Sequence, residues 1–203
     1  MDIKRYEEVR KDVDDRLGEM VEEISGAIGV LREDQQFVRV RALVAFSFLE
    51  IASNLYNAFY DRGLGDRPLL EEWVKKYCVT GSNATYKTHP YLKLVNEKFL
   101  YKFSCAIVHA FGLPEPENGV SINMPNGSES TDVIRDWDGK FKKLGHTVAF
   151  ISPDTLIKLF IDGFTLMHAD VFKDASVATQ ADLDGLERIS KEFARRGARI
   201  MPI

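Results

Sequence analysis

The segment 98–112 holds the side chains with the clearest chemical potential in this chain. At about 100° per residue in a helix, one strip would carry an imidazole, a thiol and two ammonium groups, from His109, Cys105, Lys98 and Lys102. Histidine transfers protons near neutral pH and lysine offsets negative charge, so the strip suits acid–base chemistry on an anionic substrate. The residues alone favour a plainer interpretation, in which His109 is hydrogen-bonded inside a bundle and the lysines extend into solvent.

A polar stripe precedes this segment on another expected helix. It recurs at spacings of three and four residues, through Ser47, Glu50, Asn54, Asn57 and Asp61. Such a stripe is commonly a solvated face. A sharper hypothesis has Glu50 and Asn54 facing His109, where a carboxylate would accept the imidazole N–H, fix its tautomer and raise its pKa. The apolar residues around Glu50 predict an internal position for this carboxylate.

The first half of the chain must supply the helices that position these residues. Hydrophobic periodicity predicts long helices over 3–31 and 36–62, the second ended by Gly63 and Gly65. A shorter helix is expected over 69–78. His89-Pro90 is expected to open the helix that carries the chemical strip and ends near Gly112, because proline is favoured at the first helical position.

The second half is expected to add a β insertion and two helices. Residues 114–151 are rich in proline and glycine, with alternating strand-like stretches at 120–123 and 147–151 and an Asn-Gly turn signal between them. Ser152 predicts the start of a helix that reaches about residue 172, and the capping-box pattern at 179–182 predicts a last one. The predicted fold is all-α: an up-and-down bundle of about six helices with a small antiparallel β insertion over about 114–151, in one domain spanning 1–203. Trp73 and Trp137 are interpreted as packing or interface residues, and Cys105 as a buried thiol on a packed helix rather than a nucleophile.

The amino-acid composition narrows the range of possible functions and partners. The 203 residues include 27 Lys and Arg and 31 Asp and Glu. The resulting net charge of −4 argues against a broad basic surface that binds nucleic acid. Any RNA contact must therefore concentrate on the strip. The two cysteines make no disulfide framework and the four histidines are scattered, so we expect no metal and no cofactor. The apolar region 42–60 contains a carboxylate and two amides, so we expect a cytoplasmic protein without a membrane partner.

The segment 101–109, Tyr-Lys-Phe-Ser-Cys-Ala-Ile-Val-His, resembles the signature helix of HEPN-domain proteins. These are helical bundles widespread in prokaryotic defence and toxin–antitoxin systems. Members typically carry arginine, a polar residue, three more residues and then histidine, and often an acidic or amide residue on an upstream helix, where this chain has Glu50 and Asn54. The resemblance covers roughly 37–112, with weaker support over 151–172. It implies a homodimer, and active members resemble one another as metal-independent endoribonucleases whose paired Arg and His residues meet in a cleft.

This sequence departs from the HEPN pattern at the arginine. Ser104 stands at that position and Cys105 at the next, so only His109 is carried over. The nearest cation by helical phase is Lys102, with Lys98 one turn further. The loss of the arginine favours a non-catalytic or weakly active dimer that binds RNA, a nucleotide or a protein partner in a phage-defence or toxin–antitoxin setting.

Two alternatives stay open from the sequence. One is an active metal-independent endoribonuclease that uses His109 with Lys102, since an ammonium group could replace part of the missing guanidinium charge. The other is a regulatory or structural module that acts through the insertion at 114–145.

Overall fold

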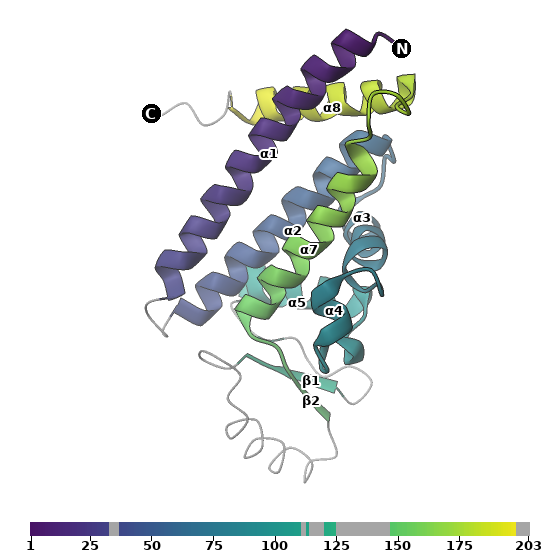
Figure 1. Ribbon diagram of the computed structural model, residues 1–203. Coiled ribbons are helices and arrows are strands. Elements are labelled where there is room, and N and C mark those ends of the chain that lie inside the picture. The colour runs from purple at the N-terminus through teal and green to yellow at the C-terminus, as the bar shows by residue number, and fades with distance from the viewer. Residues whose placement is uncertain (33–36, 111–112, 114–119, 125–146, 198–203) are drawn as a thin grey trace.

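The computed structural model describes residues 1–32, 37–110, 113, 120–124 and 147–197 (Figure 1). Within these ranges the protein is all-α, as predicted, with seven α-helices of which six are substantial. The bounds are α1 (Ile3–Arg32), α2 (Val38–Tyr60), α3 (Asp66–Trp73), α4 (Ala84–Thr88), α5 (Glu97–Ala110), α7 (Pro153–Val171) and α8 (Gln180–Gly197). A π-helical turn, Val74–Cys78, continues α3, and a 3₁₀ turn, Leu92–Leu94, precedes α5.

Helices α2 and α7 form the centre of the core, and they run in the same direction. Phe46 packs on Phe160 and Phe48 on Phe164, with ring centroids 5.6 and 5.5 Å apart, so the contacts advance together along both helices. Tilted ring pairs of this kind add to the stabilisation by apolar burial. The predicted up-and-down alternation does not hold for this pair, because the two helices are packed in parallel.

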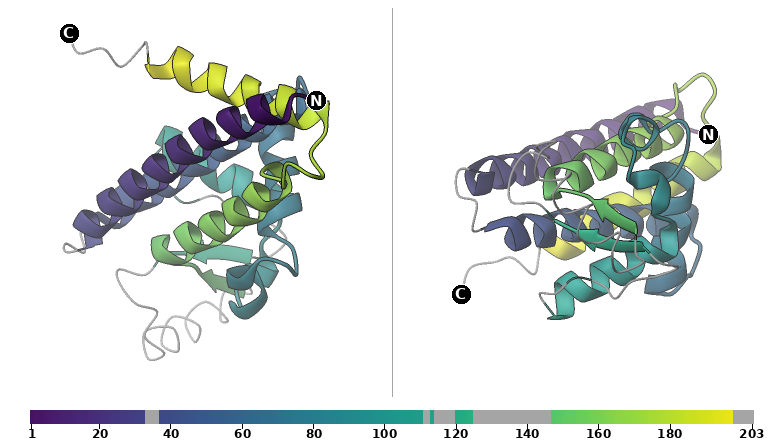
Figure 2. Two further views of the ribbon diagram at one scale, coloured as in Figure 1. Left: turned by 45° about the horizontal axis from the view of Figure 1, so that its top comes forward. Right: turned by 90° about the horizontal axis from the view of Figure 1, so that it is seen from below.

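Helix α2 is the longest apolar segment, and in the part of the chain that the structure describes it is the one helix long and apolar enough to cross a membrane. More than half of its most apolar window is buried against other helices, as is usual for the central helix of a bundle. Seen from below, α1 and α5 lie on opposite sides of α2 (Figure 2).

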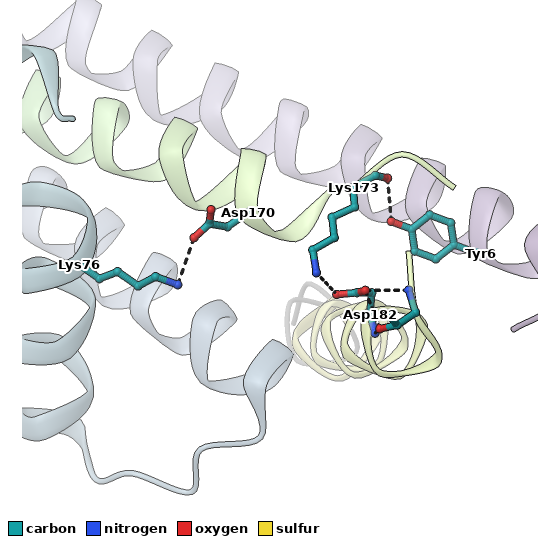
Figure 3. A network of polar contacts seen from close by, with 6 residues as sticks. Tyr6, Lys76, Asp170, Lys173 and Asp182 are labelled. Carbon is teal, nitrogen blue, oxygen red and sulfur yellow. Dashed lines mark hydrogen bonds and ion pairs between the residues drawn. The ribbon is translucent and has the colours of Figure 1, made fainter. Parts of the chain in front are cut away.

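Helix α8 crosses the end of the bundle at which α1 begins (Figure 1). Its capping box forms as predicted: the backbone N–H and the hydroxyl of Thr179 donate to Oδ2 of Asp182 at 2.8 and 2.7 Å. Lys173 Nζ donates to Oδ1 of the same carboxylate at 2.8 Å, and the Tyr6 hydroxyl donates to the Lys173 carbonyl at 2.9 Å (Figure 3). This polar network joins α1, α8 and the turn that follows α7.

The carboxyl end of α2 is closed by α8 rather than by the predicted glycines alone. Arg188 donates through Nε to the Ala58 carbonyl and through Nη2 to the Phe59 carbonyl, at 2.7 and 2.6 Å, so two carbonyls of the last helical turn are satisfied. Asp61 adopts the left-handed conformation (φ 50°) that ends the helix, and Gly63 (φ 60°) completes the turn. The helix therefore ends two residues before the predicted limit.

The π-helical turn after α3 is tied to α2 and α7 by Lys76. Its ammonium lies over the rings of Tyr56, Tyr60 and Tyr77, 4.7–5.6 Å from their centroids, and pairs with Asp170 at 3.1 Å (Figure 3). Cation–π contacts and the ion pair act together here, because both hold the same ammonium group.

The prediction for the start of α5 was wrong. His89 and Pro90 lie in the connection between α4 and α5, and α5 begins at Glu97. The Asn96 side chain accepts a hydrogen bond from the Phe99 backbone N–H at 2.8 Å, which is the capping contact that proline cannot provide. The predicted helix 69–78 begins three residues earlier, at Asp66.

The β insertion contains its two predicted strands in a different arrangement. β1 (Val120–Asn123) and β2 (Thr147–Phe150) pair in parallel, so the prediction of an antiparallel pair was wrong. A parallel pair needs a crossover rather than a tight hairpin, and the Asn-Gly turn signal lies outside the described residues together with Trp137. After β2, Ser152 caps α7 as predicted, accepting the Thr155 backbone N–H at 3.1 Å.

A candidate binding pocket between α2, α3 and α5

A pocket of about 370 Å³ opens where α2, α3 and α5 meet. We call it the Glu50 pocket; the described residues that line it are Glu50, Ser53, Asn54, Asp66, Leu69, Leu70, Tyr101, Ser104, Cys105 and Val108. Its size falls within the range of small-molecule sites in proteins, which is roughly 300–1,000 Å³.

Helical periodicity explains how α5 contributes to both the core and the pocket. Leu100, Phe103 and Ile107 are fully buried, and the Phe103 ring packs against Phe46 of α2 at 5.0 Å between centroids. The neighbouring face presents residues spaced three, four and seven apart, which are Tyr101, Ser104, Cys105 and Val108. Because the buried face of α5 is packed in the core, the orientation of its pocket-lining face is fixed as well.

Four of the predicted site residues meet in this pocket. Glu50 and Asn54 come from α2, and Ser104 and Cys105 come from α5. The prediction of an internal Glu50 was wrong, because its side chain is exposed at the pocket. Apolar neighbours on a helix show that some face is buried, but they do not show which face the carboxylate occupies.

Ser104 and Ser53 are the most buried polar residues of the pocket lining, each 3% exposed. The Ser104 hydroxyl makes no hydrogen bond within the described part of the chain, whereas the neighbouring Ser53 donates to the Glu50 carbonyl at 3.0 Å. Ser104 therefore offers a hydroxyl group without a partner among the described residues to the pocket.

The electrostatic character of the pocket is acidic. Glu50 and Asp66 contribute carboxylates, and none of the described lining residues is Lys, Arg or His. The Arg67 guanidinium lies 5.3 Å from the centroid of the Tyr101 ring and is paired with Glu71 at 2.8 Å. The lining thus favours positive charge over negative charge.

Tyr101 and Cys105 interact within the pocket wall. A hydrogen bond with the Cys105 thiol, together with desolvation, raises the pKa of the Tyr101 hydroxyl. Tyr101 consequently remains protonated at neutral pH and serves as a neutral hydrogen-bonding group.

The two cysteines lie in different environments. Cys105 is only half-buried and lines the pocket, so its interpretation as a buried packing residue was wrong. Cys78 is fully buried, and burial raises the pKa of its thiol. Trp73, in contrast, is the packing residue it was predicted to be, with no exposed surface and an indole N–H that contacts the Met167 sulfur at 3.1 Å.

The predicted site lysines and histidine are not among the described residues that line the pocket. Lys98 and Lys102 are exposed on α5 and are not among the residues that line the pocket. His109 lies in the last turn of α5, and its side chain is outside the described residues. Its pairing with Glu50 or Asn54 therefore stays a prediction.

The polar stripe of α2 continues beyond the Glu50 pocket. A hollow of about 140 Å³ is lined by Asn54 and Asn57, and an adjoining one of about 340 Å³ by Asn57 and Asp61 with Arg188 and Lys191 of α8. Asn57 Oδ1 is buried there and has no hydrogen-bond partner in the part of the chain that the structure describes. The stripe is a groove-lining face, acidic at the Glu50 end and mixed in charge at the α8 end.

Sequence reasoning missed Asp66 and Tyr101. Tyr101 lies three residues before Ser104, so helical spacing offered a signal for it. Asp66 offered none, because its place depends on how α3 packs against α5.

No group of three or more His, Cys, Asp or Glu residues in the described ranges has the geometry of a metal site. His168 contacts Asp14 at 2.7 Å, which occupies one of the four histidines with a carboxylate on α1.

Comparisons with protein-family models, with curated proteins and with solved structures give no match to this chain.

Proposed function

We propose that the protein is a non-catalytic HEPN-like helical module, active in the cytoplasm as a homodimer, that binds a partner or ligand at the Glu50 pocket. The observation that carries the proposal is the acidic lining of this pocket, where Ser104 stands in the position of the family's arginine. A defence or toxin–antitoxin setting remains the biological context that we propose.

Phosphodiester cleavage makes opposite demands on such a site. It needs positive charge near the phosphate, a group that takes the proton of the 2′-hydroxyl and a group that protonates the leaving oxygen. Glu50 and Asp66 would repel the phosphate, and no described lining residue offsets that repulsion. The acidic lining supports binding without RNA cleavage.

The two other candidate functions receive less support. An endoribonuclease that uses His109 with Lys102 would have to place its substrate on the exposed flank of α5, because Lys102 does not line the pocket. A module acting through the insertion has no observation that favours it, since most of 114–145 lies outside the described residues.

The direct experiment is an RNA cleavage assay with purified wild-type protein and the His109→Ala and Ser104→Arg variants. We expect intact RNA under multiple-turnover conditions with the wild type and with His109→Ala. Turnover by the wild type that disappears in His109→Ala would refute the proposal. Cleavage gained only in Ser104→Arg would support it, since a restored guanidinium would then supply the absent function.

A further inference from the structure

We infer that the Glu50 pocket binds a small organic cation, an amine or a guanidine with a short apolar body. This inference rests on the proposed binding function and names the chemical class of the ligand.

The charge of the pocket lining favours a cationic ligand. Within the described part of the chain, neither the Glu50 nor the Asp66 side chain makes an ion pair or a hydrogen bond. Two carboxylates in the lining of one pocket give it a negative potential, which favours a positively charged ligand. A phosphate or a carboxylate ligand would be disfavoured by the same potential.

The polar lining of the pocket offers a hydroxyl group to a ligand. Ser104 is 3% exposed as a residue, and its hydroxyl, which has no partner among the described residues, can accept a hydrogen bond from a ligand N–H. Leu69, Leu70 and Val108 provide apolar wall beside it. An ammonium or guanidinium group near the carboxylates and a short aliphatic body against this wall would satisfy both kinds of surface.

A metal ion fits the pocket less well than an organic cation. Divalent ions need several oxygen or sulfur ligands that converge at short distance. No such cluster of His, Cys, Asp or Glu occurs in the described ranges, and a metal would leave the apolar wall unused.

Cys105 provides a reporter inside the pocket. It is half-buried in the lining, whereas Cys78, the other cysteine of the chain, is fully buried and its thiol pKa is raised by burial. Reagents that modify thiols of the folded protein should therefore react at Cys105, and a Cys105→Ser variant should remain unlabelled.

The first arm of the test compares two methanethiosulfonates of similar size, one with a trimethylammonium group and one with a sulfonate. Each forms a mixed disulfide with the thiol and releases methanesulfinate, and each rate is divided by the rate with a free small thiol. We expect the cationic reagent to be favoured by at least about fivefold. The preference should fall to about one in the Glu50→Gln/Asp66→Asn variant and persist in Asp15→Asn/Glu19→Gln, whose substitutions lie on exposed positions of α1.

The second arm measures protection of Cys105 from neutral iodoacetamide by agmatine, with AMP and glutarate as anionic comparisons. We expect saturable protection by agmatine, lost in Glu50→Gln/Asp66→Asn, and none from the anions. Absence of a cation preference, absence of protection by agmatine, or protection by AMP would each overturn the inference. A protein that fails here and still leaves RNA intact retains the proposed non-catalytic function, whereas His109-dependent cleavage refutes that function whatever the pocket binds.

Discussion

The junction of α1 with α8 and the Glu50 pocket both gather carboxylates and hydroxyls on helices, but they differ in whether those groups are partnered. At the junction, Asp182 receives hydrogen bonds from Lys173 and Thr179 (Figure 3). In the pocket, Glu50, Asp66 and Ser104 have no side-chain partner among the described residues. Polar residues that satisfy one another hold the fold, while polar residues left open at a cavity are available to a ligand.

Of the substitutions that separate the two regions, Asp182→Ala should cause the largest loss of stability. The substitution leaves Lys173 without its carboxylate and removes the capping contacts of Thr179. We expect the free energy of unfolding to fall by about 3 kcal/mol. This is the lower end of the range for broken buried ion pairs, because Lys173 is partly exposed. Asp66→Ala is the matched pocket variant, and we expect it to cost less than about 1 kcal/mol. Urea denaturation measures both, and equal losses would remove the distinction between the two regions.

A smaller loss is expected from Gly185→Ala on α8. A Cβ at this position would lie 2.6 Å from a ring carbon of Phe59 and 2.9 Å from its carbonyl oxygen, so α8 would have to move away from α2, at about 2 kcal/mol. Gly26→Ala on α1 is the control, since its Cβ would meet nothing within 4 Å. We expect Gly26→Ala to stabilise the protein by about 0.5–1 kcal/mol, because alanine favours the helix. Thermal unfolding of the two variants should move in opposite directions.

The junction of α1 with α8 should also make the free energy of unfolding depend on pH. Burial alone would raise the pKa of Asp182, but hydrogen bonds from Lys173 and Thr179 hold it below its usual value. A carboxylate with a lowered pKa in the folded state stabilises the protein above its unfolded pKa of about 3.9, and this contribution disappears as the pH falls through the folded pKa. Denaturation at pH 6 and pH 3 should show a greater loss for the wild type than for Asp182→Asn; parallel losses would exclude Asp182 as a source of the acid sensitivity.

The smallest change in the free energy of unfolding is predicted for a substitution at Ser104. Because its hydroxyl has no partner in the described structure, Ser104→Ala should change the free energy of unfolding by less than about 0.5 kcal/mol. Ser152→Ala, which removes the capping contact to Thr155 at the start of α7, should cost about 1 kcal/mol. A destabilisation by Ser104→Ala as large as that by Ser152→Ala would show that Ser104 is structural.

Local capping signals in the sequence correctly predicted the starts of α7 and α8, whereas the proline signal at residue 90 did not mark the start of α5. Ser152 and the Thr179–Asp182 box lie where their patterns placed them, because a capping side chain acts within one helical turn. The end of α2 was less predictable, since Arg188, 130 residues away from Ala58, satisfies its last carbonyls. The direction of β1 relative to β2 was unpredictable for a related reason: a turn signal does not show which strands pair.

The candidate site was predictable in part. Spacing on α2 and α5 selected Glu50, Asn54 and Cys105, and the resemblance to HEPN proteins selected Ser104. All four residues line one pocket. Spacing alone did not separate this face of α5 from the exposed flank that carries Lys98 and Lys102, and it gave no indication of Asp66. The acidic character of the pocket follows from the packing of α3 against α5, which a single helical pattern does not contain.

The central claim is that the open polar groups of the Glu50 pocket serve a cationic ligand. Calorimetric titration of agmatine into the wild type and into Glu50→Gln/Asp66→Asn tests it most directly. We predict saturable binding at one site per chain, weakened at least about tenfold in the variant, as expected when two favourable charges are removed. No heat of binding from agmatine, or equal affinity in the two proteins, would contradict the account.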